Sequence, residues 1–404
     1  MRIKPFRASE RALRITYAIR DLVSLAEKVK RESGEEILYL NIGDPLKYDF
    51  KVPQHMQDAI CKAVKEGFNF YAHSIGLAEL REAIVKREKR DNGIDISPED
   101  VLVTNGTAEA IMAVLAALRP GDEILVPSPT YPPYISAAEF FEIKPIEYRT
   151  IEEEGWIPDI DDIRKKISEK TRAIVIINPN NPTGALYDEK IVKEIIDIAG
   201  EHSLFIISDE IYDRIVFEGS KAPNAAKLAG DVPTLVFYGL SKVYLATGWR
   251  IGYVYKWDPD DALSEIWRAM IKYLMVRISG FTPAQRAAIA ALLGPQDHIK
   301  ELVNKLRERR DYAYKRLNEI NGISVQKPRG AFYLFPRIDI PKYKGRDKDF
   351  VVDLLKEEKV LVVHGSGFGS YGKDHFRMVF LPPIEMMREA LERIERFVKK
   401  VKER

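Results

Sequence analysis

The chain has 404 residues, 46% of them apolar, and its 63 basic residues nearly balance 61 acidic ones. This size and composition indicate a folded globular protein with a large core and two domains, and they exclude a disordered chain. A net charge of +2 gives no global reason to expect nucleic acid or a membrane as a partner. The single cysteine, Cys61, excludes an intramolecular disulfide and fits a reducing compartment.

Targeting and metal signals are lacking in the sequence. Residues 1–14 carry scattered charges and no apolar core, so we expect no signal peptide. No apolar stretch approaches the ~20 residues that span a bilayer. The six histidines are dispersed, and none stands at metal-ligand spacing. We therefore expect a cytoplasmic protein without a metal site.

Seven short apolar runs in the first three quarters of the chain predict strands. They lie at residues 101–103, 123–126, 143–148, 173–177, 204–207, 235–238 and 251–255. Between the fourth and fifth runs, residues 188–199 have helical spacing, with Asp188 expected to cap the helix and Gly200 to end it. A strand–helix–strand crossover is typical of a parallel sheet with helices on its faces. The predicted fold is α/β, with a mostly parallel seven-stranded sheet in a large domain over residues 48–294.

The pattern changes after residue 295. Helices are expected at 298–320, at 348–358 and after Pro382-Pro383, and strands around 331–335, 360–364 and 377–380. This mixture indicates a small α+β domain. Residues 1–47 have a mixed helical pattern and are expected to pack with residues 295–404.

Polar side chains follow several of the predicted strands, where a parallel sheet binds its ligands. Lys242 follows the sixth run, and a buried cation there is costly unless it has a role. Asp209 follows the fifth run and requires a cationic partner. Tyr212 shares a helical face with Asp209, and Asn181 lies in an Asn-rich turn. Taken singly, Asp209 is explained as a helix cap, Tyr212 as a core tyrosine and Asn181 as part of a polar turn.

A phosphate site is indicated beside them. Residues 104–108 follow the first strand and open a helix, whose first N–H groups and the Thr107 hydroxyl would face an anion. Arg250 can add a bidentate contact and Ser241 a hydroxyl. Tyr131 lies in a Pro-rich turn, where it either stacks on a planar ligand or packs against the turn. Together the groups suit a planar phosphorylated aldehyde, pyridoxal 5′-phosphate, with Lys242 as its covalent anchor.

Three segments in order and at matching spacing, residues 178–184, 208–212 and 241–252, resemble the class I/II aminotransferases of the pyridoxal-phosphate fold-type I superfamily. The resemblance runs from Asn41 to Met378. Several segments look most like alanine aminotransferases. Tyr131 stands where aspartate aminotransferases tend to have tryptophan.

The resemblance implies a role for each matching residue. Lys242 would be the Schiff-base lysine and the acid and base of the reaction, Asp209 would pair with the pyridine nitrogen, and Asn181 and Tyr212 would bond the 3′ oxygen. Groups near the phosphate would be Gly106, Thr107, Ala108, Ser241 and Arg250, with Tyr131 stacked on the ring.

The resemblance also implies substrate contacts and an assembly. Arg377 would hold the substrate α-carboxylate, and Gly43 would approach the substrate. Tyr71 would reach the phosphate of the neighbouring subunit in a homodimer. The expected reaction is ping-pong amino transfer from an L-amino acid, alanine first, to a 2-oxo acid, 2-oxoglutarate first. Arg277 is a further arginine for a second carboxylate, although a surface position is commoner for this residue type.

Other readings stay open at this point. An aspartate, aromatic or broad-specificity aminotransferase, or a carbon–sulfur lyase, would use nearly the same residues. Residues 367–372 spell the G-x-G-x-x-G of a nucleotide-binding dehydrogenase, but an apolar run follows where that motif requires a helix. A non-catalytic regulator would need a DNA-binding module, and no basic helix-turn-helix pattern precedes residue 40.

Overall fold

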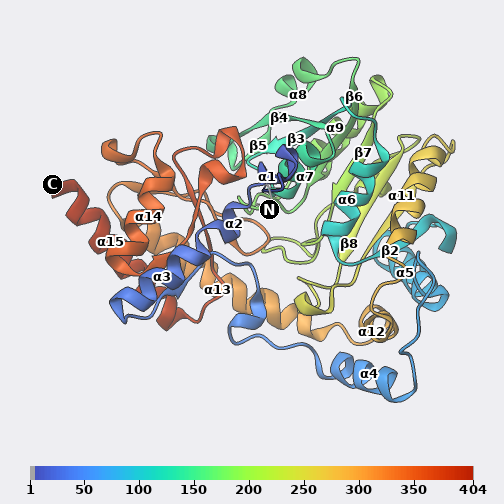
Figure 1. Ribbon diagram of the computed structural model, residues 1–404, viewed down its shortest axis with the longest axis horizontal. Coiled ribbons are helices and arrows are strands. Elements are labelled where there is room, and N and C mark those ends of the chain that lie inside the picture. The colour runs from blue at the N-terminus through green and yellow to red at the C-terminus, as the bar shows by residue number, and fades with distance from the viewer. Residues whose placement is uncertain (1–4, 404) are drawn as a thin grey trace, which may run out of the picture.

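The computed structural model describes residues 5–403. Its main feature is an eight-stranded sheet of order β2-β9-β8-β7-β6-β3-β4-β5 (Figure 1). The strands are β2 (Val101–Thr104), β3 (Glu123–Ser128), β4 (Lys144–Ile151), β5 (Ile157–Pro158), β6 (Thr171–Ile177), β7 (Phe205–Asp209), β8 (Thr234–Gly239) and β9 (Gly252–Trp257). The five strands from β8 to β4 are parallel, whereas β9 and β5 run antiparallel to their neighbours.

The predicted α/β class is confirmed. All seven predicted strands are present in the sheet, and β5 adds an eighth at its edge. This extra strand has only two residues and pairs with the end of β4. Such a short segment has no alternation of apolar and polar residues that sequence reasoning could detect.

Helices cover both faces of the sheet, which explains why its strands are continuous apolar runs. One face packs against α6 (Thr107–Ala117), α7 (Pro133–Phe140) and α11 (Ser264–Val276). The other packs against α8 (Ile160–Lys166), α9 (Glu189–Glu201) and α10 (Ala225–Leu228).

Helix α9 shows one correct and one wrong expectation. The Asp188 side chain caps the helix by accepting a hydrogen bond from the backbone N–H of Ile191, as predicted. Gly200 does not end the helix but lies inside its last turn. A Cβ at Gly200 would lie 3.0 Å from a methyl group of Val232, so glycine serves close packing there and not termination.

The C-terminal part of the chain forms smaller sheets and long helices. Its strands are β10 (Ile323–Ser324), β11 (Tyr333–Leu334), β12 (Arg337–Ile338), β13 (Val360–Leu361), β14 (Val363–His364) and β15 (Phe376–Val379). Its helices are α13 (Asp297–Glu319), α14 (Asp347–Glu358) and α15 (Ile384–Glu403). The predicted helices are therefore present, while the expected strand at 331–335 shrinks to the two residues of β11.

The N-terminal segment lies against this C-terminal part. Strand β1 (Leu38–Tyr39) pairs in parallel with β13, and helix α3 (Val23–Ser33) lies beside α14 (Figure 1). Two short helices, α1 (Glu10–Leu13) and α2 (Ala18–Asp21), precede α3. The domain boundaries at residues 48 and 294 stay a prediction.

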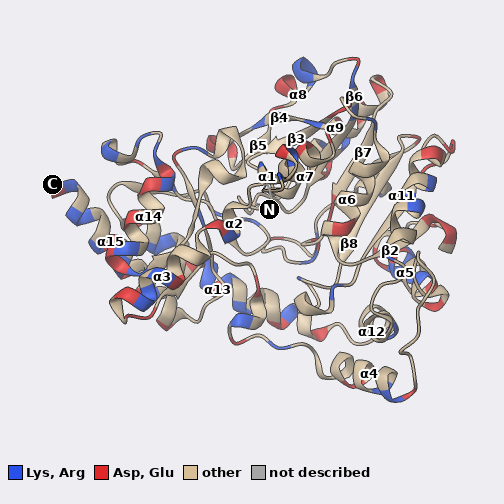
Figure 2. Ribbon diagram, in the orientation of Figure 1, with Lys and Arg blue, Asp and Glu red and all other residues tan. Residues whose placement is uncertain are grey.

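The remaining helices complete the described chain. Helices α4 (Gln54–Lys65) and α5 (Ala78–Asn92) pack against α12 (Thr282–Leu293). The short 3₁₀ helices are η1 (Pro45–Lys47), η2 (Pro98–Asp100), η3 (Glu152–Glu154), η4 (Thr247–Trp249), η5 (Pro341–Tyr343), η6 (Gly365–Phe368) and η7 (Ser370–Gly372). Acidic and basic residues are interspersed along the outer helices (Figure 2).

Residues 5–403 contain neither a membrane-spanning helix nor a cluster of metal-binding side chains. No helix among them has the length and apolar character needed to cross a membrane. Within the same residues, no three His, Cys, Asp or Glu side chains lie close enough to hold a metal ion.

Candidate active site

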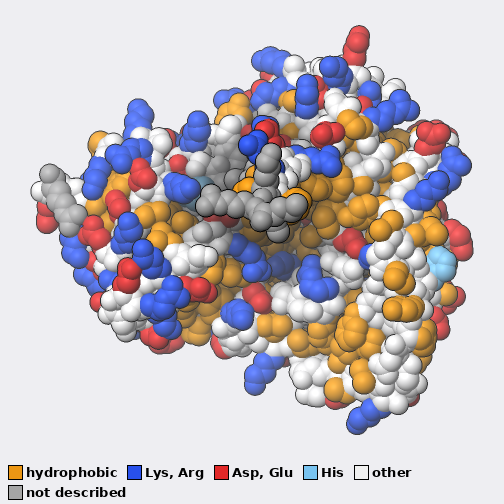
Figure 3. Space-filling model, in the orientation of Figure 1, with side chains coloured by type: hydrophobic (Ala, Val, Ile, Leu, Met, Phe, Trp, Pro, Cys, Tyr) orange, Lys and Arg blue, Asp and Glu red, His pale blue; other side chains and the backbone are white. Residues whose placement is uncertain are grey.

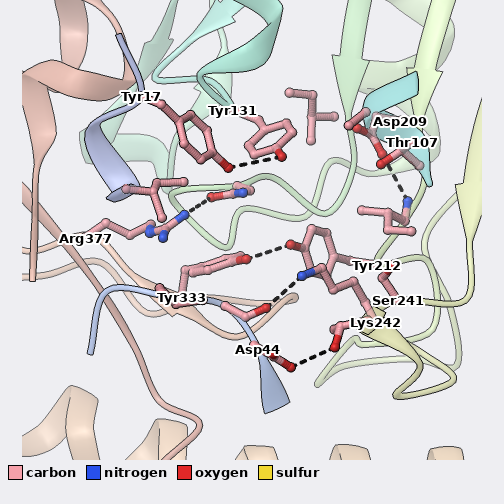
Figure 4. A pocket seen from close by; sticks show the side chains of 18 of the residues that line it. Tyr17, Asp44, Thr107, Tyr131, Asp209, Tyr212, Ser241, Lys242, Tyr333 and Arg377 are labelled. Atoms are coloured by element: carbon pink, nitrogen blue, oxygen red, sulfur yellow. Dashed lines mark hydrogen bonds between the residues drawn. The ribbon is translucent and has the colours of Figure 1, made fainter. Parts of the chain in front are cut away.

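A cavity of about 490 Å³ opens at the carboxyl ends of the parallel strands (Figure 4). Most of the predicted site residues line it: Gly43, Thr107, Ala108, Tyr131, Asn181, Asp209, Tyr212, Ser241, Lys242, Arg250 and Arg377. These residues come from the N-terminal segment, from the ends of several strands and from β15. The fold therefore gathers into one cavity side chains that are far apart in the sequence.

Lys242 follows β8 and reaches across the cavity to the N-terminal segment. Its Nζ donates a hydrogen bond to the carbonyl oxygen of Gly43 at 2.7 Å (Figure 4). Burial lowers the pKa of Lys242 to about 8, against the opposing effect of Asp44. The amine therefore gains and loses a proton near neutral pH, as an acid–base group requires.

Asp209 ends β7 on the floor of the cavity. Burial raises the pKa of its carboxyl to about 6, while hydrogen bonds from the Ile211 N–H and the Tyr134 hydroxyl act in the opposite direction. The Tyr134 hydroxyl donates to Oδ2 at 3.1 Å. A cationic ring nitrogen placed beside Asp209 would ionise it and be stabilised in return.

The anion end of the cavity lies at the start of α6. Gly106 caps this helix with a φ of 79°, and a Cβ there would lie 2.3 Å from Nη2 of Arg250. Gly106 does not line the cavity itself, but only glycine allows the helix start to approach the guanidinium. Arg250 also donates to the Thr247 carbonyl at 3.0 Å and lies 3.5 Å from the Ser241 hydroxyl. The first N–H groups of α6, two hydroxyls and a guanidinium thus face one region.

Tyr212 and Asn181 also line the cavity, and each has a protein partner. The hydroxyl groups of Tyr212 and Tyr333 are 2.7 Å apart (Figure 4). Oδ1 of Asn181 accepts a hydrogen bond from Nη1 of Arg377 at 2.8 Å. Because Oδ1 is already used as an acceptor, the Nδ2 group of Asn181 is the part of the side chain that can donate to a ligand oxygen.

Arg377, on β15, is 1% exposed, and burial lowers its pKa. Besides Asn181 it donates from Nη2 to the Asn41 carbonyl at 2.5 Å, and its guanidinium lies 4.5 Å from the centre of the Tyr333 ring. Its Nε has no hydrogen-bond partner among residues 5–403. None of these contacts neutralises the charge, so the guanidinium is preorganised for a carboxylate.

Sequence reasoning missed several residues of the cavity. Tyr17, which precedes the short helix α2, lines it with its hydroxyl 3.3 Å from that of Tyr131, and Arg20, on α2, lines it as well. Asp44 and Tyr333 also line it. Asp44 directly follows Gly43, which was a signal that could have found it, whereas nothing in the pattern of residues 17–20 points to this cavity.

Two further residues considered in the sequence analysis, Tyr71 and Arg277, do not line the cavity. Tyr71 is 81% exposed and does not line the cavity, so a role toward a second subunit stays a prediction. Arg277 does not line the cavity either: its side chain is 15% exposed and its Nε donates to Glu109 at 2.9 Å, so contact with a second carboxylate stays a prediction.

The G-x-G-x-x-G segment does not form a nucleotide-binding turn. It lies in η6 and η7 and leads into strand β15, not into a helix. The dehydrogenase reading is therefore wrong, for the reason that the apolar run at 377–381 already indicated.

Comparison with known proteins decides the family. The family model for "Aminotransferase class I and II" matches residues 35–394. The chain belongs to this family. It is 37% identical to glutamate-pyruvate aminotransferase AlaA of Escherichia coli over 98% of both chains, and 38% identical to an alanine aminotransferase of Mycobacterium tuberculosis over 98% of this chain and 94% of that protein.

Solved structures agree with this assignment. An alanine aminotransferase from Pyrococcus furiosus is 57% identical, with a TM-score of 0.95, and the match covers 98% of this chain and all of that one. An aspartate aminotransferase from Thermus thermophilus is 31% identical, with a TM-score of 0.88 over 97% and 100% of the two chains. The resemblance found in the sequence is confirmed.

Class I and II aminotransferases depend on pyridoxal phosphate as a family, and the donor set of this cavity fits that group. Lys242 would supply the amine for its aldehyde, and the close approach of α6 to Arg250 at Gly106 would supply the donors for its phosphate. Asp209 would meet the ring nitrogen. The cavity therefore offers a matching partner for each functional group of the cofactor.

Proposed function

We propose that this protein binds pyridoxal phosphate and transfers the amino group of L-alanine to 2-oxoglutarate in a ping-pong cycle. Support comes from the alanine and glutamate-pyruvate aminotransferases that match nearly its whole length. The single observation that carries the proposal is the position of Lys242, a half-buried amine with a pKa of about 8 that shares one cavity with Asp209, Arg250 and Arg377.

When bound, the cofactor supplies an aldehyde that exchanges amines and a ring that accepts electrons. The chain supplies the rest. Arg377 holds the substrate carboxylate through its guanidinium, and this fixes the orientation of the α-carbon. Nζ of Lys242 then takes the proton from the α-carbon and later returns it. Asp209 stabilises the positive charge on the ring nitrogen of the cofactor. Thr107, Ser241 and Arg250 hold its phosphate.

We further propose a cytoplasmic homodimer in which Tyr71 reaches the site of the neighbouring subunit. Exposed apolar side chains support an interface over α4, α11 and α12 (Figure 3). Val276 is 86% exposed at the end of α11, and Phe70 and Phe281 are each more than half exposed. Apolar residues on the surface of a monomer are ordinarily scattered singly, so a group of them indicates an interaction site.

The test is direct. Purified protein with added pyridoxal phosphate is given alanine and 2-oxoglutarate, and pyruvate and glutamate are measured together. Equal amounts of both products support the proposal, and the Lys242→Ala variant should form neither. No pyruvate from alanine, in protein that turns over aspartate or aromatic amino acids instead, would reassign the substrate.

A carbon–sulfur lyase is the second candidate, because it needs the same residues. It would release a thiol and pyruvate from cystathionine without any 2-oxo acid. Thiol release that exceeds amino transfer would favour the lyase, whereas dependence on the acceptor acid favours the transaminase.

A further inference from the structure

Asp44 is an acidic residue of the cavity with no role in the proposed function. It caps the short helix η1 by accepting a hydrogen bond at Oδ1 from the Leu46 N–H at 3.2 Å. The same oxygen accepts from the hydroxyl of Thr247 at 2.9 Å (Figure 4). Thr247 is the first residue of η4, which follows Lys242 closely in the chain. Asp44 therefore joins the N-terminal segment to the segment that carries the reactive lysine.

The residue before Asp44 contacts the lysine directly. The Gly43 carbonyl accepts the hydrogen bond from Nζ of Lys242 at 2.7 Å. A Cβ on Gly43 would lie 2.3 Å from the Tyr333 hydroxyl, so the segment is wedged between Tyr333 and the lysine. Because the Gly43 carbonyl and Asp44 belong to consecutive residues, a shift of the Asp44 carboxylate also moves the acceptor of the lysine.

Four charged groups face the amine, two of each sign. Arg377 and Arg250 disfavour the ammonium form, and Asp44 and Asp209 favour it. After burial, which lowers the pKa of Lys242, Asp44 exerts the largest effect of the four. In the proposed function Asp209 is engaged by the ring nitrogen of the cofactor. Arg250 and Arg377 are engaged there by the phosphate and the substrate carboxylate, so Asp44 is the charged side chain left to act on the amine.

We propose that Asp44, anchored by Thr247, is a positioning residue for Lys242: it fixes the Gly43 carbonyl against Nζ and supplies the negative charge that faces the protonated amine. This role rests on the proposed function, in which the free amine first takes and then returns a proton. An amine that is tethered and favoured as the ammonium holds its proton until it is returned.

The test measures the lysine without cofactor or substrate. Cofactor-free protein is labelled with a limiting amount of acetic anhydride from about pH 6 to about pH 10, and the Lys242 peptide is quantified against the exposed Lys190 by mass spectrometry. Asp44→Asn keeps the oxygen that accepts both hydrogen bonds and removes only the charge. We expect labelling of Lys242 at neutral pH to rise about two- to threefold, as a half-unit fall of a pKa near 8 gives.

A matched pair at Thr247 separates anchoring from charge. Thr247→Val removes the donor to Asp44, and Thr247→Ser keeps it. The valine variant should change the labelling profile of Lys242, and the serine variant should match the unmodified protein. If Asp44→Asn is folded and labels Lys242 as the unmodified protein does at every pH, the proposal is wrong.

The remaining outcomes are also decisive. If Asp44→Asn does not fold, equal profiles for the valine and serine variants overturn the proposal, and different profiles support it. The labelling is independent of turnover. Failure to form pyruvate from alanine would therefore refute the proposed function while leaving this measurement valid.

Discussion

The most exacting prediction concerns Arg87, a buried cation on α5 whose side chain is 2% exposed. Its guanidinium bonds Glu88 at 2.6 Å and Asp213 at 2.5 Å, and Asp91 lies 3.2 Å from its Nε. It also lies 4.0 Å from the centre of the Tyr238 ring. Asp213 directly follows the site residue Tyr212, so this network ties α5 to the cavity wall.

Replacing Arg87 with methionine keeps much of the packing volume and removes the charge. Glu88 and Asp213 then lose their cation, whereas Asp91 keeps its ion pair with Arg90, and breaking a buried ion pair from one side costs about 3–5 kcal/mol. With an unfolding entropy of ~2.1 cal/mol/K per residue, a 404-residue chain has ~0.85 kcal/mol/K. The expected fall in Tm is therefore about 4–6 °C by differential scanning calorimetry.

The second variant and the pH dependence sharpen this test. Arg87→Met with Asp213→Asn should recover part of the loss, because one unpaired carboxylate is gone. Burial already raises the pKa of Asp213 against the effect of Arg87, so the loss in the single variant should shrink as the pH falls. A single variant whose Tm stays within about 1 °C of the unmodified protein would refute the reasoning.

Three further outcomes are expected. Arg377→Lys should raise KM for the amino acid about 10- to 100-fold with a smaller effect on Tm, because a lysine cannot make the bidentate contact; an unchanged KM in steady-state kinetics would contradict this role. Burial lowers the pKa of His298 to about 4, below its ordinary value of 6.5, so the stabilisation is complete above about pH 6.5 and is lost as pH falls toward 4; His298→Gln should flatten the slope of Tm against pH in that window. Glu152, which bonds both Arg337 and His375, joins β4 to the C-terminal part, so Glu152→Gln should speed cleavage by a protease at limiting concentration, whereas the exposed Glu153→Gln should not.

The large sheet was predictable because its strands are buried on both faces and therefore stand out as apolar runs. The two-residue strands β5 and β11 were not, since pairing of so few residues depends on a neighbour and not on their own sequence. The end of α9 was misjudged for a related reason. Gly200 serves a contact with Val232, which is distant in the chain, whereas sequence reasoning considered only its local conformation.

The site was predictable where chemistry is unusual for its position. Lys242 and Asp209 are charged residues that follow buried strands, and such residues demand an explanation. Tyr17 and Thr247 were missed because a tyrosine or threonine in a loop is ordinary, and only the folded chain brings them to the cavity. The partners of Arg377 were likewise hidden, because Asn181 and Asn41 precede it by 196 and 336 residues.

The cavity takes its walls from both ends of the chain, with Gly43 on one side and Arg377 on the other. Contacts between such distant residues form late, since loop closure over most of a polypeptide is slow. A chain that stops before β15 lacks the wall that carries Arg377. The pocket therefore exists only after β15 has been made, and products that terminate before it should be unable to compete with the folded protein for its substrates.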